Sequence, residues 1–207
     1  MLHFQTVEPT TLSLLKKLQR IPALNSFHLV GDTALALKYG HRISIDIDLF
    51  GNNFDEKTIV NALHKEFGVS FEYEKTHLEW GLFCFIENVK VDIIAYQHPL
   101  LQDIETPEYI RMLSTLDIAA MKVNAILGRG SKKDFWDINE ILKHFSMEEI
   151  INAHSRKFPQ QMLLISIPQA LTYFEDAEES LPPVCLNGLE WKTVKKNISK
   201  KVNEYLS

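Results

Sequence analysis

The sequence predicts an α+β fold, in which an α/β core with a mixed sheet flanked by helices precedes a helical C-terminal region. Strand-like patterns with two unlike faces are confined to the first half of the chain, and helical periodicity dominates after about residue 110. The chain has 207 residues, 45% of them hydrophobic and 24% charged, which suffices for a buried core. We therefore expect a core at residues 1–110 and a helical region at 111–207.

The first half alternates helical and strand-like segments. Apolar residues at 12, 14, 15 and 18 have helical spacing, a short apolar run ends at Gly31, and Gly40 stops the helix that follows it. Strict alternation of apolar and polar residues marks one strand, and Glu87-Asn88 separates two further strand-like runs, so a tight antiparallel connection is expected there. The predicted elements are helix 10–18, strand 27–30, helix 33–39, strand 43–50, helix 56–67 and strands 80–86 and 89–96.

The second half is predicted to be helical throughout. An apolar stripe of leucine, isoleucine, alanine and valine predicts the first helix, and Gly128-Arg129-Gly130 ends it. Ser131 and Asp134 fit a capping box at the start of the next helix. Pro168 is expected to kink or split one of the later helices. The predicted helices are 115–127, 131–145, 147–156, 160–174 and 189–205.

Composition excludes several classes of protein. Lys plus Arg is 22 and Asp plus Glu is 27, a net charge of −5, so a basic surface for nucleic acid over the whole molecule is absent. No stretch approaches the 18 apolar residues that a membrane helix needs, and the N-terminus lacks the pattern of a signal peptide. Cys84 and Cys185 have neither zinc-binding nor disulfide-framework spacing. We expect a soluble cytoplasmic protein.

Two aspartates on one predicted strand, Asp46 and Asp48, are the most informative residues. Residues i and i+2 of a strand share a face, and like charges there repel unless the strand end is solvated or a cation lies between them. Two divalent metals held by such carboxylates form the clamp used for in-line displacement at phosphorus. Asp92, on the polar face of a later strand, is placed to supply a third carboxylate. The alternative is that all three are ordinary charges on an exposed strand edge.

The segment before these aspartates reads as strand, glycine turn and helix start. A glycine at residue 31 lets backbone N–H groups approach a ligand, and a helix N-terminus favours phosphate. Asp32 follows it, where a carboxylate would repel a triphosphate. Three interpretations of Asp32 stay open: it caps the helix, it binds a metal ion, or its negative charge impairs nucleotide binding.

Two blocks of residues resemble a known family, the AbiEii/AbiGii toxin-type nucleotidyltransferases of the DNA polymerase β-like nucleotidyltransferase superfamily. The first is Gly31-Asp32-Thr33-Ala34-Leu35 followed by His41-Arg42-x-Ser44-x-Asp46-Ile47-Asp48-Leu49-Phe50. The second is Leu116-Asp117-x-x-Ala120-x-Lys122-x-x-Ala125-x-x-x-Arg129-x-x-x-Lys133-Asp134-x-x-Asp137. Together they cover about residues 25–140. Asp32 departs from the family, which usually has a second glycine or a serine there.

The resemblance implies transfer of a nucleoside monophosphate from an NTP to a hydroxyl, with loss of pyrophosphate. Asp46, Asp48 and Asp92 would be catalytic and would hold two Mg²⁺ ions. Some family members are toxins of type IV toxin–antitoxin or phage-defence pairs, and tRNA is the acceptor of some, so RNA and a cognate antitoxin are implied partners. The residues implied to bind nucleotide or phosphate are Gly31, Asp32, Thr33, Arg42, Ser44, Lys122, Arg129 and Lys133.

Basic residues of the predicted helices add to this picture. Lys122 and Arg129 are seven residues apart, which returns to nearly the same helix face, and Asp137 is a candidate to orient one of them. The lysine-rich stretch 192–201 is a further candidate for RNA or an acidic partner. Two alternatives stay open: a nucleotide- or partner-binding protein that has lost catalysis, and a transferase acting on a protein or a small molecule.

Overall fold

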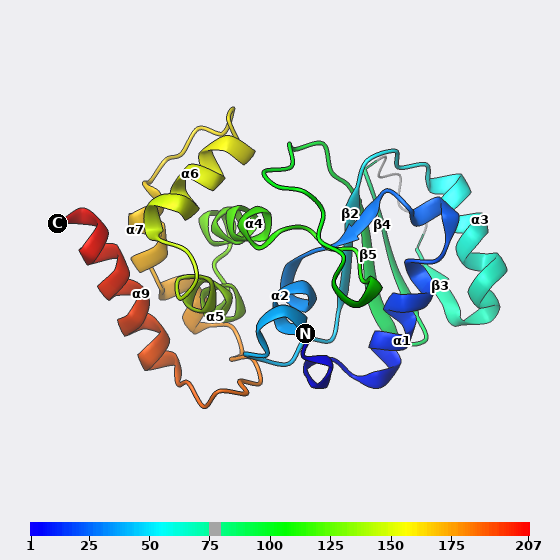
Figure 1. The fold of residues 1–207 in the computed structure, drawn as a ribbon, viewed down its shortest axis with the longest axis horizontal. Helices are drawn as coiled ribbons and strands as arrows, with labels where there is room; N and C mark the ends of the chain where they lie inside the picture. Colours follow the sequence, from blue (N-terminus) through cyan, green and yellow to red (C-terminus); the bar gives the residue numbers. More distant parts are fainter. Residues whose placement is uncertain (75–79) are drawn as a thin grey trace. The chain divides into compact units, whose positions relative to one another are not determined.

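The computed structural model describes residues 1–74 and 80–207 and divides the chain into two compact units (Figure 1). Unit 1 comprises residues 1–40, 44–97 and 104–113, and unit 2 comprises residues 41–43, 98–103 and 114–207. Both units therefore draw on segments from more than one part of the sequence. No helix in the described ranges combines the length and the apolar content needed to cross a membrane.

Unit 1 is built on a mixed five-stranded sheet, which confirms the predicted fold class. Its strands are β1 (Phe27–Leu29), β2 (Ile47–Gly51), β3 (Phe71–Tyr73), β4 (Gly81–Ile86) and β5 (Val89–Ala95). Their spatial order is β1-β2-β5-β4-β3, and only β2 and β5 run parallel. The β4–β5 hairpin turns at Glu87 and Asn88, both with positive φ, as the predicted tight connection requires.

Three helices accompany this sheet: α1 (Pro9–Leu18), α2 (Gly31–Tyr39) and α3 (Glu56–Phe67). The predicted helices at these places are confirmed, and Gly40 ends α2 in the left-handed conformation that glycine adopts readily. Figure 1 shows α1 and α3 on the same side of the sheet, and α3 packs against β3 and β4. Short 3₁₀ turns occupy Phe4–Thr6, Pro22–Leu24, Gly68–Ser70 and Pro107–Tyr109.

The strands present two different faces because side chains alternate along them. One face is fully buried and belongs to the core, with Ile47, Leu49, Cys84, Val91 and Ile93. Burial, with the nearby negative charge of Asp92 adding to it, raises the pKa of Cys84 to about 12, which keeps this thiol protonated. The opposite face is only partly buried and carries charged and aromatic side chains, among them the candidate functional residues.

The strand expected at 43–50 begins only at Ile47, so this prediction was wrong in its start. Residues before it are held by isolated bridges, Ser44 to Val7 within unit 1 and Arg42 to Cys185 within unit 2. Their alternating pattern arises from these separate contacts rather than from one continuous strand, and Asp46 consequently lies just before β2. The short strand β3 was not predicted, because three residues are too few to show a clear alternation.

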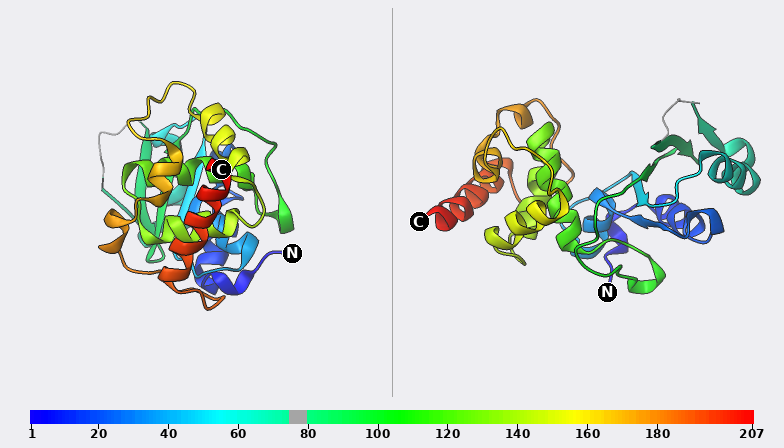
Figure 2. Two further views of the ribbon diagram at one scale, coloured as in Figure 1. Left: turned by 90° about the vertical axis from the view of Figure 1, so that its left-hand side faces the viewer. Right: turned by 90° about the horizontal axis from the view of Figure 1, so that it is seen from above.

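Unit 2 is helical, as predicted. Its helices are α4 (Thr115–Gly128), α5 (Lys132–Ile141), α6 (Met147–Lys157), α7 (Ile167–Thr172), α8 (Glu175–Glu178) and α9 (Trp191–Leu206). Helix α4 packs against α5, α6 and α7, and α9 packs against α5 and α7 (Figure 2). The helix expected at 160–174 is only α7, because Ser166 caps a new helix and Pro168 sits in its first turn, where proline is tolerated.

A fully buried ion pair joins three segments of unit 2. Lys157, at the end of α6, donates to Asp117 of α4 at 2.6 Å and to the carbonyl of Pro99 at 2.9 Å. Asp117 also accepts from the backbone N–H groups of Leu101 and Gln102. With several hydrogen bonds to each charge, the pair meets the condition under which buried charges are tolerated.

Candidate functional site

Asp48 and Asp92 face one another directly across two neighbouring strands. The parallel β2–β5 ladder pairs Asp48 with Asp92, and both side chains lie on the partly buried face of the sheet. Paired residues of adjacent strands have closely spaced Cβ atoms, so the two carboxylates are held side by side. This confirms the expectation that the Asp46–Asp48 segment runs beside the strand of Asp92.

Lys90 is the cation of this carboxylate group. Its Nζ lies 2.6 Å from Asp92 Oδ2. Burial lowers the pKa of Lys90, but the hydrogen bond to Asp92 and the negative charges of Asp92, Asp48 and Asp46 outweigh it and raise the pKa overall. All three predicted carboxylates therefore act on one ammonium group. The sequence patterns did not single out Lys90, although its place two residues before Asp92 puts both on the same strand face.

The two carboxylate oxygens of Asp92 have different surroundings. Its Oδ1 atom is buried and has no hydrogen-bond partner among the described residues, while Oδ2 binds Lys90. Buried carboxylate oxygens are usually satisfied, so an unsatisfied one points to a proton donor or a cation that binds during function. Within residues 1–74 and 80–207, no three His, Cys, Asp or Glu side chains form a ready-made metal cluster. The three carboxylates, including the Asp92 oxygen without a hydrogen-bond partner among the described residues, are ligands that suit a hard cation such as Mg²⁺.

The glycine turn before α2 lies against Asp48. Gly31 has φ +66°, and a Cβ atom added to it would lie 2.8 Å from Asp48 Oδ2. The N–H of Val30 also donates to the carbonyl of Asp48 at 3.0 Å. The positive end of the α2 dipole is thereby brought to the carboxylates, a place suited to phosphate.

Asp32 is not the cap of this helix, so that interpretation was wrong. The N-cap position is Val30, which makes no side-chain cap hydrogen bond, and α2 begins at Gly31. Asp32 is the second residue of the first turn and is 8% exposed. A carboxylate in the first turn interacts favourably with the helix dipole, which accounts for its presence without a ligand.

Thr33 and Ser44, both implied to bind phosphate, are buried and bonded to one another. Their hydroxyl oxygens are 2.9 Å apart, and Thr33 Oγ1 also donates to the carbonyl of Asp46. These contacts tie α2 to the backbone of the residue that carries the first carboxylate. The geometry favours a positioning role for Thr33 and Ser44 over direct contact with a ligand.

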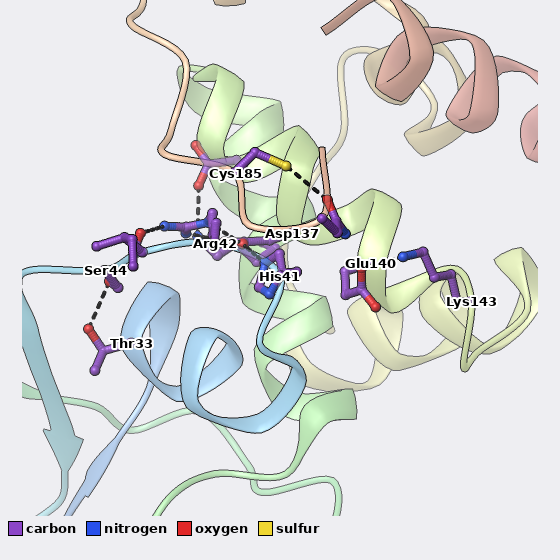
Figure 3. Close-up of polar contacts among 12 residues, drawn as sticks. Thr33, His41, Arg42, Ser44, Asp137, Glu140, Lys143 and Cys185 are labelled. Atoms are coloured by element: carbon purple, nitrogen blue, oxygen red, sulfur yellow. Dashed lines mark hydrogen bonds and ion pairs between the residues drawn. The ribbon is translucent and has the colours of Figure 1, made fainter. Parts of the chain in front are cut away.

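A buried charge network surrounds Asp137 in unit 2 (Figure 3). Arg42 binds Asp137 through two parallel hydrogen bonds of 2.7 and 2.8 Å, and His41 Nε2 lies 2.8 Å from the same carboxylate. Lys122 Nζ lies 2.7 Å from Asp137 and 3.0 Å from Asp134. Burial raises the pKa of Asp137, but the charges of Arg42 and Lys122 and the hydrogen bonds outweigh it and lower the pKa to about 2. The expected contact between Asp137 and Lys122 is confirmed.

This network engages two of the residues implied to bind phosphate. Arg42 and Lys122 are 2% and 5% exposed, so both charges are used inside unit 2. Asp134 forms the predicted capping box with Ser131. Arg129 differs, because its side chain is 69% exposed and lies 4.0 Å from Asp134. Lys133, in the first turn of α5, is partly exposed. A phosphate contact of Arg129 or Lys133 stays a prediction.

Comparisons with known proteins agree with this architecture. Residues 13–197 match the sequence model of a family described as nucleotidyl transferase AbiEii toxin of type IV toxin–antitoxin systems. An uncharacterized protein of Aquifex aeolicus is 33% identical over 201 residues, which are 93% of this chain and 94% of that protein.

Solved structures of low sequence identity share the fold. A Helicobacter pylori protein described as a candidate nucleotidyltransferase superimposes with a TM-score of 0.56 at 16% identity, over 97% of this chain and 99% of that one. The nucleotidyltransferase toxin MenT4 of Mycobacterium tuberculosis gives a TM-score of 0.55 at 14% identity, over 86% of this chain and 74% of that one. The antibiotic-resistance factor ANT(2'')-Ia gives 0.53 at 13% identity, over 70% and 91%.

Proposed function

Since the chain belongs to the AbiEii nucleotidyltransferase toxin family, we propose that it transfers a nucleoside monophosphate from an NTP to a hydroxyl group of an RNA acceptor. The observation that carries this proposal is the pairing of Asp48 with Asp92 across β2 and β5, with Asp46 and the Gly31 turn beside them. This places carboxylates and a helix N-terminus together, as phosphoryl transfer needs. As the family is described as toxins of type IV toxin–antitoxin systems, we include a cognate antitoxin, and a role in phage defence, in the proposal.

In the proposed reaction, the acceptor oxygen attacks the α-phosphorus, the bond to the β-phosphate breaks, and pyrophosphate leaves. Asp92 Oδ1, which lacks a hydrogen-bond partner among the described residues, is suited to receive the proton of the attacking hydroxyl. The Gly31 turn orients the phosphates with its backbone N–H groups. Asp46, Asp48 and Asp92 would hold Mg²⁺, which neutralises charge on the phosphoryl oxygens and the leaving group when bound.

The direct test offers the protein each of the four NTPs with Mg²⁺ and total RNA. We expect pyrophosphate release together with incorporation of α-phosphate label into RNA, and loss of both when Mg²⁺ is chelated. Label appearing in a protein or a small molecule instead would contradict the RNA acceptor. Absence of pyrophosphate release with every NTP and acceptor would support the alternative of a binding protein that has lost catalysis, with Asp32 as its cause.

Gly31→Ala is expected to reduce nucleotide transfer more than it reduces the stability of the fold. Alanine at φ +66° costs roughly 1–2 kcal/mol, and its Cβ would lie 2.8 Å from Asp48 Oδ2, so the carboxylate must move. Gly68→Ala is the matched control, because Gly68 has φ +53° and open space where a Cβ would be. We expect both variants to lose unfolding free energy by denaturant titration, but only Gly31→Ala to lose transfer. Equal transfer by the two variants would show that the close approach to Asp48 is unimportant.

A further inference from the structure

Aromatic side chains lie beside the carboxylates on the same face of the sheet. The antiparallel β4–β5 ladder pairs Phe83 with Asp92 and Phe85 with Lys90, so each ring stands next to a charged residue of the site. Across β2, β5 and β4 the order of side chains is Asp48, Asp92 and Phe83. The aromatic surface is thus continuous with the carboxylate group and part of the same rigid sheet.

This aromatic surface is open to solvent. Phe85 is 53% exposed and Trp80 is 50% exposed, and the Trp80 ring packs edge-on against Phe83 with centroids 5.5 Å apart. A hollow of about 450 Å³ lies over this surface, lined among others by Phe83, Phe85, Lys90 and Asp92. Exposed aromatic side chains that adjoin one another form a contiguous apolar patch, and such patches mark binding surfaces more than single exposed residues do.

The charges around the hollow favour a flat uncharged ring over a phosphate. Glu72 and Glu74 line it together with Asp92. Among the described lining residues Lys90 is the one cation, and it is already bound to Asp92 at 2.6 Å. A phosphate group in this hollow would meet net negative charge. A nucleobase is neutral and stacks on aromatic rings, a contact worth about 1–3 kcal/mol per base.

We infer that Phe83, Phe85 and Trp80 form a stacking surface for an unpaired base of the acceptor, which brings the hydroxyl of that nucleotide to Asp92. This inference rests on the proposed function, since it assigns the acceptor of that reaction to RNA with an unstacked terminal nucleotide. Single-stranded loops, bulges and ends of RNA have bases that are free to stack on protein rings, and an end also offers a free hydroxyl to the proposed transfer. The pairing of Phe83 with Asp92 sets the base and the proton acceptor on adjacent strands.

The inference is tested first by binding, without NTP, so that the outcome does not depend on transfer. The probe is a short single-stranded RNA with a 5′ fluorophore and a free 3′ end, followed by fluorescence anisotropy. Phe85→Ala is expected to weaken binding on the order of 5- to 150-fold, the range that corresponds to loss of one stacked base. Phe85→Trp should restore binding, whereas Phe85→Leu, which is apolar but lacks a ring, should not. Tyr109→Ala, at a 93% exposed aromatic residue, is the matched control and should bind as wild type does.

A second probe that lacks its 3′-terminal base isolates the stacking contact. We expect this abasic RNA to bind wild type and Phe85→Ala with equal affinity, because the base that would meet the ring is missing. In transfer assays, Phe85→Ala should raise the KM for RNA and leave the KM for NTP unchanged. The inference would be overturned if the wild type bound the abasic RNA as tightly as the intact RNA, or if Phe85→Leu bound the intact RNA as tightly as the wild type does. If RNA is labelled normally by Phe85→Ala, the proposed function stands and the stacking surface is refuted.

Discussion

Asp48→Asn is expected to abolish Mg²⁺-dependent nucleotide transfer and to leave the fold intact. Asparagine keeps the shape of the side chain and one carbonyl oxygen, but it removes the negative charge that holds a hard divalent cation. Charge developing on the phosphoryl oxygens and on pyrophosphate is then not neutralised. We expect transfer to fall by at least on the order of 10²–10³-fold, the loss seen when one electrostatic stabiliser of a transition state is removed. Asp46→Asn should behave in the same way.

The melting temperature distinguishes this metal-binding role of Asp48 from a structural role. Asp46, Asp48 and Asp92 share one ammonium, that of Lys90, so removing one carboxylate relieves repulsion in the metal-free protein. The melting temperature without Mg²⁺ should therefore be unchanged or slightly raised. Stabilisation by Mg²⁺ plus NTP, if the wild type shows it, should disappear. Asp103→Asn, at an exposed aspartate, is the control and should keep full transfer. A variant that melts well below the wild type without metal would make Asp48 a structural hydrogen-bond acceptor.

Asp137→Ala is expected to cause the largest loss of stability, about 3–5 kcal/mol of unfolding free energy. Asp137 is fully buried and is bonded to Arg42, Lys122 and His41. Its removal leaves two buried cations without their main counter-charge. Denaturant titration measures the loss, with Asp103→Ala as the exposed control. A loss below about 1 kcal/mol would show that the network adds little to the stability of the fold.

Protonation of Asp137 is expected to lower the stability of the fold at acid pH. Its folded pKa of about 2 lies below the usual value of 3.8, so its stabilising contribution is fully present above about pH 4. That contribution is lost progressively as the pH falls from about 4 to 2. In Asp137→Asn, which cannot titrate at this position, the melting temperature should fall less steeply over this interval. Parallel pH profiles for the variant and the wild type would contradict the assignment.

Local sequence patterns determined much of the secondary structure. The capping box of Ser131 and Asp134, the Glu87-Asn88 turn and the stop at Gly40 were all predicted from the sequence, because each depends on residues within a few positions of one another. Alternation also predicted the strand faces of Asp48 and Asp92, whereas Asp46 lies just before β2. A charge on a strand with an apolar opposite face has a known direction once the strand is recognised.

Tertiary structure decided what those residues contact. The register that sets Asp48 opposite Asp92 joins residues 44 positions apart, and no local pattern encodes it. Likewise, the seven-residue spacing of Lys122 and Arg129 does not show whether Lys122 is exposed. Packing buries Lys122 against Asp137, where the ion pair stabilises the fold. Of the three interpretations of Asp32 that the sequence left open, the helix cap was excluded only by the backbone, which places the cap at Val30. The physical reason is common to all three: burial, register and ion pairing depend on which segments meet, and that is settled by packing of the whole chain rather than by neighbours in sequence.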